Sequence, residues 1–215
     1  MIISQQKVEL VTTMGDDLMV VNVARVSFDK FHEVFEEGKD DKLISYLAKH
    51  QHWSPFAHPQ AQFRIKAPIF VARQLVKHQI GLTWNEVSRR YVDSEPEFYF
   101  PTTWRARAES VKQGSGEDLE DSKSLDIYPR QAMEHCMVAY KILIDSNVAP
   151  EQARMVLPQN MMTEWIWTGS LAAWSRVCNL RLDPHAQKET QEVAGKISAE
   201  MGLRFPVSWR ALTHE

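Results

Sequence analysis

The sequence contains little cysteine, and its two cysteines form no recognisable metal or redox motif. Cys136 and Cys178 are the only two in 215 residues, and neither lies in a Cys-x-x-Cys pair or near a His–Cys zinc pattern. This usage excludes a disulfide framework and indicates a reducing compartment. Cys178 follows Trp174 and Val177 on an apolar face, so we expect a buried structural thiol there.

Long apolar runs are also missing. No stretch approaches the roughly 18 apolar residues of a membrane-spanning helix. The N-terminal segment MIISQQKVEL has no long apolar core of the kind that signal peptides carry. We therefore expect a cytoplasmic protein with no membrane partner.

Neither sign of charge is in large excess, and no glycine-rich phosphate loop is present. The formal net charge is −3, which gives no positive field for a long nucleic acid, so we expect no polynucleotide partner. The segment GLTWNE, which starts at Gly81, lacks the GxGxxG and GxxxxGK[ST] spacings. A small anion would therefore have to be bound locally, by a few arginines in a pocket.

The composition is otherwise that of a soluble globular protein, with 44% hydrophobic and 25% charged residues. The length predicts one domain, residues 1–215. Alternating or β-branched segments predict strands over 2–11, 60–66 and 159–168. Apolar spacing predicts helices over 42–49, 67–76, 128–146, 150–158, 171–180 and 184–201. Over 18–26 periodicity does not separate a strand from a buried helix, and we favour a helix over 19–26. The acidic, weakly apolar stretch 108–123 predicts a mobile loop.

Caps and apolar faces refine these predictions. Asp41 and Asp183 are expected N-caps, Pro68 and Pro184 first-turn residues, and Gly202 a helix end. One apolar side is expected on the long helix 128–146, formed by Ala132, Cys136, Ala139, Tyr140, Ile142 and Leu143.

Residues 66–91 concentrate the polar chemistry of the chain. On the helix predicted over 67–76, Gln74 and His78 lie four residues apart, as do Arg73 and Lys77, so each pair shares a helix face. Beyond Gly81, Ser88 and the two arginines that follow offer hydroxyl and guanidinium donors suited to a phosphate. A solvated helix end is the alternative interpretation of the same residues.

Other polar side chains stand where apolar ones would be expected. The full set is His52, Ser54, Arg73, Gln74, Lys77, His78, Gln79, Glu86, Ser88, Arg90, Arg154, Arg181 and His185. So many cations and amides in an acidic protein indicate a small polyanionic ligand, such as a nucleotide. Residue chemistry alone does not name a reaction.

Three histidines cluster at His50, His52 and His58 and raise the question of a metal site. Their spacing matches no zinc pattern, and no carboxylate or cysteine lies among them. We therefore predict no metal. The loop at Trp53 and Ser54 is better suited to pressing an aromatic surface against a planar ligand.

Four sequence blocks resemble the flavin-dependent thymidylate synthases, which make dTMP from dUMP without a cysteine nucleophile. The blocks are ARVSF (24–28), KAPIFVARQ with NE-x-S-x-RY (66–91), ARMVLPQN (153–160) and NLRLDPHAQ-x-E-x-Q (179–191). The similarity spans about residues 24–198. It implies an α/β (α+β) domain with a central, mainly antiparallel sheet flanked by helices, assembled as a homotetramer with active sites at subunit interfaces.

The resemblance also implies the reaction and its residues. The methylene group would come from 5,10-methylenetetrahydrofolate, and FAD reduced by NADPH would complete the reduction. The implied dUMP ligands are Gln74, Glu86, Val87, Ser88, Arg90, Arg154 and Arg181, and we count Lys77 and Arg89 with them as further phosphate donors. The implied FAD contacts are His52, Ser54, Lys77, His78, Gln79, Ile80, Ser170, Arg176 and Leu180, with His52 also near the folate.

Arg181 and Ser88 are the predicted catalytic residues. Arg181 would hold the uracil edge and stabilise charge developing on the ring oxygen. Ser88, together with Arg90, would hold the phosphate. A nucleophilic role for Ser88 is the weaker interpretation, because sequence spacing fixes no base beside it.

The chain departs from the family signature in its cofactor half. Arg-His-Arg followed by seven residues and Ser is replaced by Lys77-His78-Gln79 and eight residues before Ser88. Gln79 removes a charge where FAD phosphates would lie, and Lys77 cannot form a planar guanidinium fork. Ala57 and Ser170 also differ from the usual Glu and Asn. We expect FAD to bind with altered affinity.

Two other functions are compatible with parts of the sequence. A non-catalytic nucleotide-binding relative would keep the dUMP pocket and lack flavin absorbance. A metal-dependent nucleotide hydrolase could use His50, His52, His58 and His185, and would be sensitive to a chelator.

Overall fold

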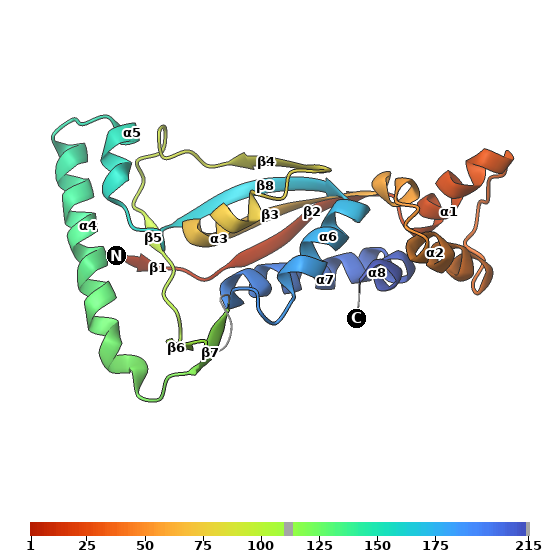
Figure 1. Cartoon of the computed structure of the whole chain (residues 1–215). Helices are drawn as coiled ribbons and strands as arrows, with labels where there is room; N and C mark the ends of the chain where they lie inside the picture. The colour runs from red at the N-terminus through yellow and green to blue at the C-terminus, as the bar shows by residue number, and fades with distance from the viewer. Residues whose placement is uncertain (110–113, 214–215) are drawn as a thin grey trace.

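A four-stranded antiparallel sheet forms the centre of the molecule (Figure 1), in a computed structural model that describes residues 1–109 and 114–213. Its strand order is β2-β3-β8-β4. The strands are β2 (Lys7–Met14), β3 (Gln60–Pro68), β8 (Met162–Ser170) and β4 (Leu82–Glu86). The predicted antiparallel sheet with flanking helices is therefore confirmed.

Strands β3 and β8 pair over their whole length, from Gln60 opposite Ser170 to Pro68 opposite Met162. One face of this ladder is buried, and its aromatic pair Phe63 and Trp167 is fully covered. The other face carries polar contacts, such as that of the directly opposed Gln62 and Thr168 and the diagonal contact of Arg64 with Glu164. This period of two is the alternation that predicted the strand over 60–66.

Helices cover the sheet and extend beyond both of its ends. In Figure 1, α6, α7 and α8 lie along one side of the sheet, α1 and α2 lie beyond one end, and α4 and α5 lie beyond the other. The helices are α1 (Asp17–Arg25), α2 (Lys39–Lys49), α3 (Ile69–Leu75), α4 (Ile127–Asp145), α5 (Pro150–Ala153), α6 (Leu171–Arg181), α7 (Lys188–Arg204) and α8 (Pro206–Leu212). No helix in the described ranges is long and apolar enough to cross a membrane.

Short strands and 3₁₀ turns complete the chain. Strand β1 pairs in parallel with β5, and β6 pairs antiparallel with β7. Their bounds are β1 (Ile2–Ile3), β5 (Glu97–Phe98), β6 (Arg105–Arg107) and β7 (Ser115–Asp118). The 3₁₀ turns are η1 (Val26–Phe28), η2 (Ser54–Ala57), η3 (Ser122–Asp126) and η4 (Arg154–Val156).

Tryptophan packing fills the main core between the sheet and α6. The Trp174 ring lies 5.0 Å from Phe63 and 4.8 Å from Trp167, centroid to centroid, both edge to face. Trp84 stacks on Trp165 at 4.3 Å. Such pairs contribute beyond their buried area, and they hold β3, β8, β4 and α6 as one rigid support.

A buried ion pair joins α1 to α2. Arg25 Nη2 lies 2.6 Å from Asp40 Oδ1, and the side chains are 12% and 0% exposed. Asp40 Oδ2 also accepts from the Glu36 backbone N–H at 2.8 Å. The arginine within the apolar run of ARVSF therefore has the partner that its burial requires.

Another buried carboxylate ties the first helix to the last. Asp17 is 7% exposed and accepts from the backbone N–H groups of Val207 and Ser208 at 2.8 and 2.9 Å. These are first-turn donors of α8, which have no partner within their own helix. Asp17 thus acts as a cap supplied from 190 residues away.

Several predicted helix starts were wrong by a few residues. Helix α2 begins at Lys39, and Asp41 lies in its first turn, accepting from the Gly38 N–H at 2.7 Å. Pro68 ends β3 and is the N-cap of α3. Asp183 instead closes a turn by accepting from the His185 N–H at 2.8 Å, and α7 begins at Lys188.

Other expectations also need correction. The strand predicted over 2–11 is divided into β1 and β2, and the helix predicted over 150–158 is divided into α5 and η4. Helix α7 continues past Gly202 to Arg204, because Gly202 lies on its half-buried side and no proline follows until Pro206. The predicted loop 108–123 contains β7, which pairs with β6, and the start of η3. Residues 110–113 of that prediction lie outside the described residues.

Helix α4 was predicted almost to the residue, but its apolar side is only partly buried. Met133 and Tyr140 are buried, whereas Val138 and Ile142 are each 58% exposed. Ala132 is exposed as well. Periodicity identifies an apolar face without identifying what covers it, and in the single chain much of this face is uncovered.

Candidate active site

The C-terminal ends of α3 and α6 bring three predicted site residues together. Arg181 Nε donates to His78 Nε2 at 2.9 Å, and Arg181 Nη2 donates to the backbone carbonyl oxygen of Gln74 at 3.4 Å. These contacts join residues more than 100 positions apart in the sequence. Because β3 and β8 are antiparallel, α3 and α6 start at opposite ends of their ladder and run back toward each other, so that their C-terminal ends meet.

Burial shapes the charge states of this cluster. Burial lowers the pKa of His78 from 6.5, and the nearby Arg181 and Arg176 cations lower it further. Burial also lowers the pKa of Arg181, which an arginine tolerates without losing its charge. A neutral His78 imidazole can accept the hydrogen bond from Arg181.

The His78 contact should weaken in acid. A histidine with a lowered folded-state pKa contributes no pH dependence above about 6.5. Below that value the unfolded state binds a proton that the folded state resists, so stability falls until the folded-state pKa is passed. We expect the Tm of the wild type to drop more than that of His78→Asn between about pH 7 and pH 5. Parallel thermal scans check this, and equal losses in the two proteins would contradict it.

A cavity of about 290 Å³ adjoins His78. It is lined by Lys77, His78, Gln79, Ile80, Leu82, Ala173, Arg176 and Leu180. Arg176 Nη2 donates to the Ile80 carbonyl oxygen at 2.7 Å. Gly81 turns the chain here at φ +75°, and a Cβ on it would lie only 3.1 Å from the Ala173 Cβ. Six of the nine predicted FAD contacts therefore line one cavity.

The other three predicted FAD contacts lie close by. Ser170 caps α6 by accepting from the Ala173 N–H at 3.2 Å. His52 lines a second cavity of about 340 Å³, which shares Arg176 with the first. Ser54 starts η2 beside His52 and is exposed, but it does not line that cavity.

The predicted phosphate-binding segment leaves the edge strand β4. Glu86 accepts from the Thr163 hydroxyl at 2.7 Å and from the Trp84 indole at 3.2 Å. Ser88 Oγ accepts from Arg90 Nε at 3.1 Å and from the Arg90 backbone N–H at 3.3 Å. A hydroxyl and a guanidinium are thus placed side by side, in an exposed position.

The remaining predicted substrate residues are held by local contacts. Arg89 donates to the Ser94 carbonyl oxygen, and Val87 is 48% exposed. Arg154 lies on η4 and donates through Nε to the Glu151 carbonyl oxygen at 3.3 Å. Within the described residues, no hydrogen bond or ion pair joins Arg154 or the segment 86–90 to Arg181. The single chain therefore presents the predicted site in separate parts.

Comparison with known proteins identifies the family. A family model described as thymidylate synthase complementing protein (Thy1) matches residues 9–207. A flavin-dependent thymidylate synthase of Thermus thermophilus is 40% identical over 204 residues, which are 95% of this chain and 74% of that protein. One from Kosmotoga olearia is 40% identical over 207 residues, covering 95% and 88%. The chain belongs to the flavin-dependent thymidylate synthase family.

Solved structures agree with this assignment. A UMP/dUMP methylase PolB from Streptomyces cacaoi, bound with 5-Br dUMP, matches with a TM-score of 0.90 and 32% identity, covering 98% of this chain and 95% of that one. The same protein bound with 5-Br UMP gives a TM-score of 0.85 and 30% identity, covering 97% and 93%. As a member of the flavin-dependent thymidylate synthase family, the chain is a methyltransferase enzyme.

The two cavities that share Arg176 fit the flavin expected in this family. Lys77 and Arg176 supply cations for a diphosphate. Ile80 and Leu180 are 83% and 55% exposed and offer apolar surface for a flat ring. The charge lost at Gln79 therefore leaves two cations at the site. The described residues contain no cluster of three or more His, Cys, Asp or Glu able to hold a metal.

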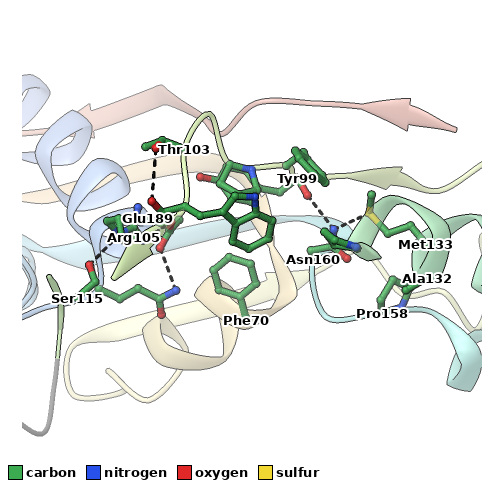
Figure 2. Close-up of a pocket in the computed structure, with 15 residues that line it drawn as sticks. Phe70, Tyr99, Thr103, Arg105, Ser115, Ala132, Met133, Pro158, Asn160 and Glu189 are labelled. Atoms are coloured by element: carbon green, nitrogen blue, oxygen red, sulfur yellow. Dashed lines mark hydrogen bonds and ion pairs between the residues drawn. The ribbon is translucent and has the colours of Figure 1, made fainter. Parts of the chain in front are cut away.

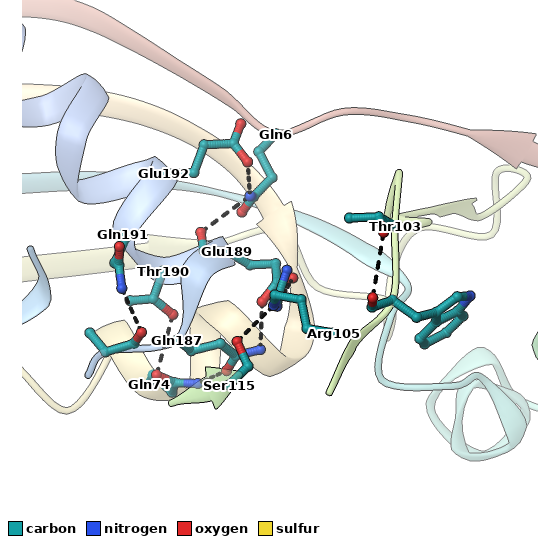
Figure 3. Close-up of polar contacts among 12 residues, drawn as sticks. Gln6, Gln74, Thr103, Arg105, Ser115, Gln187, Glu189, Thr190, Gln191 and Glu192 are labelled. Atoms are coloured by element: carbon teal, nitrogen blue, oxygen red, sulfur yellow. Dashed lines mark hydrogen bonds and ion pairs between the residues drawn. The ribbon is translucent and has the colours of Figure 1, made fainter. Parts of the chain in front are cut away.

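Sequence reasoning missed a polar network behind Gln74 (Figure 3). Gln74 Nε2 donates to Gln187 Oε1, and Thr190 Oγ1 donates to Gln74 Oε1 at 3.2 Å. Glu189 accepts from Gln187 Nε2 at 3.0 Å and from Arg105 Nη2 at 2.6 Å. The Gln-x-Glu pattern at 187–189 was the available signal. Because the helix was predicted to begin at residue 184, this pattern was not recognised as the start of α7.

Burial acts to raise the pKa of the Glu189 carboxyl, yet the pKa is held below its ordinary value. The hydrogen bond from Arg105 offsets the burial, helped by the Glu189 backbone N–H and by Gln187. Glu189 is only 5% exposed. It is therefore an ionised carboxylate that can only accept hydrogen bonds.

An aromatic cavity of about 430 Å³ opens on the far side of this network (Figure 2). Phe70, Tyr99, Phe100 and Trp104 line it, together with Gln187 and Glu189. Burial, with smaller contributions from the Glu189 and Glu192 carboxylates, raises the pKa of Tyr99 to about 12. None of the predicted site residues lines this cavity.

Proposed function

We propose that the chain converts dUMP to dTMP, taking a methylene group from 5,10-methylenetetrahydrofolate and reducing power from NADPH through FAD. The observation that carries this proposal is the cluster of Gln74, His78 and Arg181, built where the C-terminal ends of α3 and α6 meet. It lies in a fold that matches a protein named as a UMP/dUMP methylase at a TM-score of 0.90. We treat residues 1–215 as one catalytic domain.

Each residue then has a task that its chemistry allows. Arg181 keeps its charge in a half-buried position, so it can hold the uracil edge and stabilise negative charge that develops on the ring oxygen. Neutral His78 holds the Arg181 guanidinium in place. Ser88 and Arg90, with Arg89 and Lys77 as further donors, bind the phosphate.

The cofactor half of the site uses residues on both sides of Arg176. Lys77 and Arg176 would hold the diphosphate of FAD, and Ile80 and Leu180 would pack against its ring system. His52, on the neighbouring cavity, would face the folate. FAD held there would supply the hydride chemistry that completes the methyl group, with NADPH as its reductant.

We propose that the site is completed by a second subunit in a homotetramer. Two features of the single chain support this. Arg154 and the segment 86–90 lie apart from Arg181, although a dUMP molecule would need both. Helix α4 also leaves Val138 and Ile142 more than half exposed on an apolar face, the kind of surface that oligomer interfaces cover.

Incubation of the purified protein with dUMP, methylenetetrahydrofolate, FAD and NADPH should yield dTMP. Mass spectrometry of the nucleotide pool detects the added methyl group. A two-band flavin spectrum is expected in the holoprotein. A parallel incubation with UMP tests the ribonucleotide, because the similar solved structures belong to a UMP/dUMP methylase. Absence of product with FAD bound would refute the proposed reaction, and a colourless protein that no added FAD restores would refute the cofactor.

A further inference from the structure

In the network behind Gln74, it is fixed which end of each amide side chain donates a hydrogen bond and which end accepts one. An amide side chain can turn over and exchange its oxygen and nitrogen with little change of shape, so its orientation depends on its partners. Glu189 is an ionised acceptor, held by Arg105 Nη2 at 2.6 Å. Gln187 must therefore direct its N–H group toward Glu189, and it does so at 3.0 Å.

The orientation of Gln187 then determines that of Gln74. Because the side-chain nitrogen of Gln187 faces Glu189, its side-chain oxygen faces Gln74. Gln74 must therefore donate an N–H group to that oxygen. The oxygen of Gln74 consequently faces Thr190, whose hydroxyl donates to it at 3.2 Å. If Gln74 turned over, its N–H group would leave Gln187, and its oxygen would face the oxygen of Gln187.

Burial makes it costly for the amides to turn over. Thr190 is fully buried, so water does not readily replace a lost partner there. Glu189 is 5% exposed, and its carboxylate is held by Arg105. Thr190 and Glu189 both lie in the first turn of α7, where the Thr190 N–H donates to the Gln187 carbonyl oxygen at 2.9 Å. As Figure 3 shows, the supporting groups come from the start of α7 and from Arg105, while Gln74 projects from α3.

The orientation of Gln74 matters for the base that it meets. After its bonds to Gln187 and Thr190, the amide keeps one N–H group and one oxygen lone pair. Uracil presents a ring N–H beside a carbonyl oxygen, whereas cytosine presents a bare ring nitrogen beside an amino group. An amide free to turn can match either edge, but an amide held in one orientation matches only one of them in a given position.

We propose that Glu189, acting through Gln187, sets which end of the Gln74 amide faces the base, that Thr190 holds the amide in place, and that these positioning residues thereby select a uracil base over a cytosine base. This inference rests on the proposed function, in which Arg181 holds the uracil edge, and it takes Gln74, an expected dUMP ligand, to contact the pyrimidine beside it. It adds the residues that give Gln74 its selectivity, and these residues touch no substrate themselves.

Replacement of Thr190 by valine tests the proposal. Thr190→Val keeps the shape of the side chain and removes the donor to Gln74 Oε1. Calorimetric titration of the FAD-loaded protein with dUMP and with dCMP gives a discrimination ratio. We expect Thr190→Val to lower this ratio by about tenfold, mainly by weakening dUMP binding. Thr190→Ser restores the hydroxyl and should restore the ratio.

Two further variants separate orientation from general damage. Glu189→Gln keeps the shape of the side chain but can donate as well as accept. The amides of Gln187 and Gln74 can then turn over, and the dUMP-to-dCMP discrimination ratio should fall as in Thr190→Val. Thr168→Val is the matched control, because the Thr168 hydroxyl also meets a glutamine amide, that of Gln62 at 2.9 Å, but in the sheet. Its ratio should equal that of the wild type.

The outcomes are distinguishable. A wild-type ratio in folded Thr190→Val and Glu189→Gln, with dUMP still bound, would overturn the positioning role and leave the proposed function standing. An equal fall in Thr168→Val would also overturn it, since the effect would then be general. A wild-type protein that binds no dUMP would overturn both proposals.

Discussion

Replacing Arg181 with alanine is expected to lower kcat/KM for dTMP formation by about 10²- to 10³-fold. The guanidinium is the group best placed to stabilise charge on the pyrimidine, because His78 and the Gln74 carbonyl hold it in a half-buried position. Steady-state kinetics with varied dUMP measures the loss. The Tm should change by only a few degrees, since the contacts of Arg181 lie at the end of α6 rather than in the core.

Two companion variants define what the loss means. Arg181→Lys keeps the charge without the planar fork and should fall between alanine and wild type. Arg204→Ala removes an exposed arginine from the last turn of α7, far from Arg181 in the sequence, and should leave kcat/KM unchanged. Near-normal turnover in Arg181→Ala would refute the proposed role.

The same variant also tests the shared site. If one subunit supplies Arg181 and another supplies Arg90, an equal mixture of Arg181→Ala and Arg90→Ala subunits should regain about a quarter of the wild-type activity after reassembly. A mixture as inactive as its parts would indicate that a single subunit provides both arginines.

Replacing Arg25 with methionine is expected to produce the largest loss of stability. The change leaves the Asp40 carboxylate, which is 0% exposed, without the guanidinium 2.6 Å away. Removing one partner of a buried pair costs about 3–5 kcal/mol. For a chain of this size that corresponds to a fall in Tm of roughly 6–20 °C. Thermal scans at one fixed protein concentration measure it, because subunit assembly would shift Tm by mass action.

An exposed ion pair offers the matched control. Arg64 pairs with Glu164 across β3 and β8, and its side chain is 55% exposed. Arg64→Met should change the free energy of unfolding by less than about 1 kcal/mol. Equal losses from Arg25→Met and Arg64→Met would show that burial of the α1–α2 pair has no special weight.

Local sequence patterns predicted which helices and strands exist better than they predicted where each one begins and ends. Alternation over 60–66 and 159–168 located β3 and β8, because each has one buried and one wet face. Helix starts were less accurate. Asp183 and Pro184 form a favourable cap sequence, but the His185 contact turns the chain there and delays α7 until Lys188.

The contacts within the candidate site were harder to predict from the sequence than the elements of the fold. No periodicity relates Gln74 to Arg181, because their proximity depends on the pairing of β3 with β8. The family resemblance named both residues, whereas residue chemistry alone had reached only a polyanion pocket. Gln187 and Glu189 belong to one of the family blocks, but neither they nor Thr190 were given a role, because their importance lies in contacts with Gln74 that no one-dimensional pattern records.

The cap that Asp17 supplies to α8 has a consequence for protein synthesis. Asp17 leaves the ribosome about 190 residues ahead of Val207 and Ser208, whose N–H groups it accepts. In the nascent chain this cap therefore cannot form until α8 has been made and has left the ribosome. We expect chains stalled before residue 206 to be readily digested by protease, and completed, released chains to be resistant.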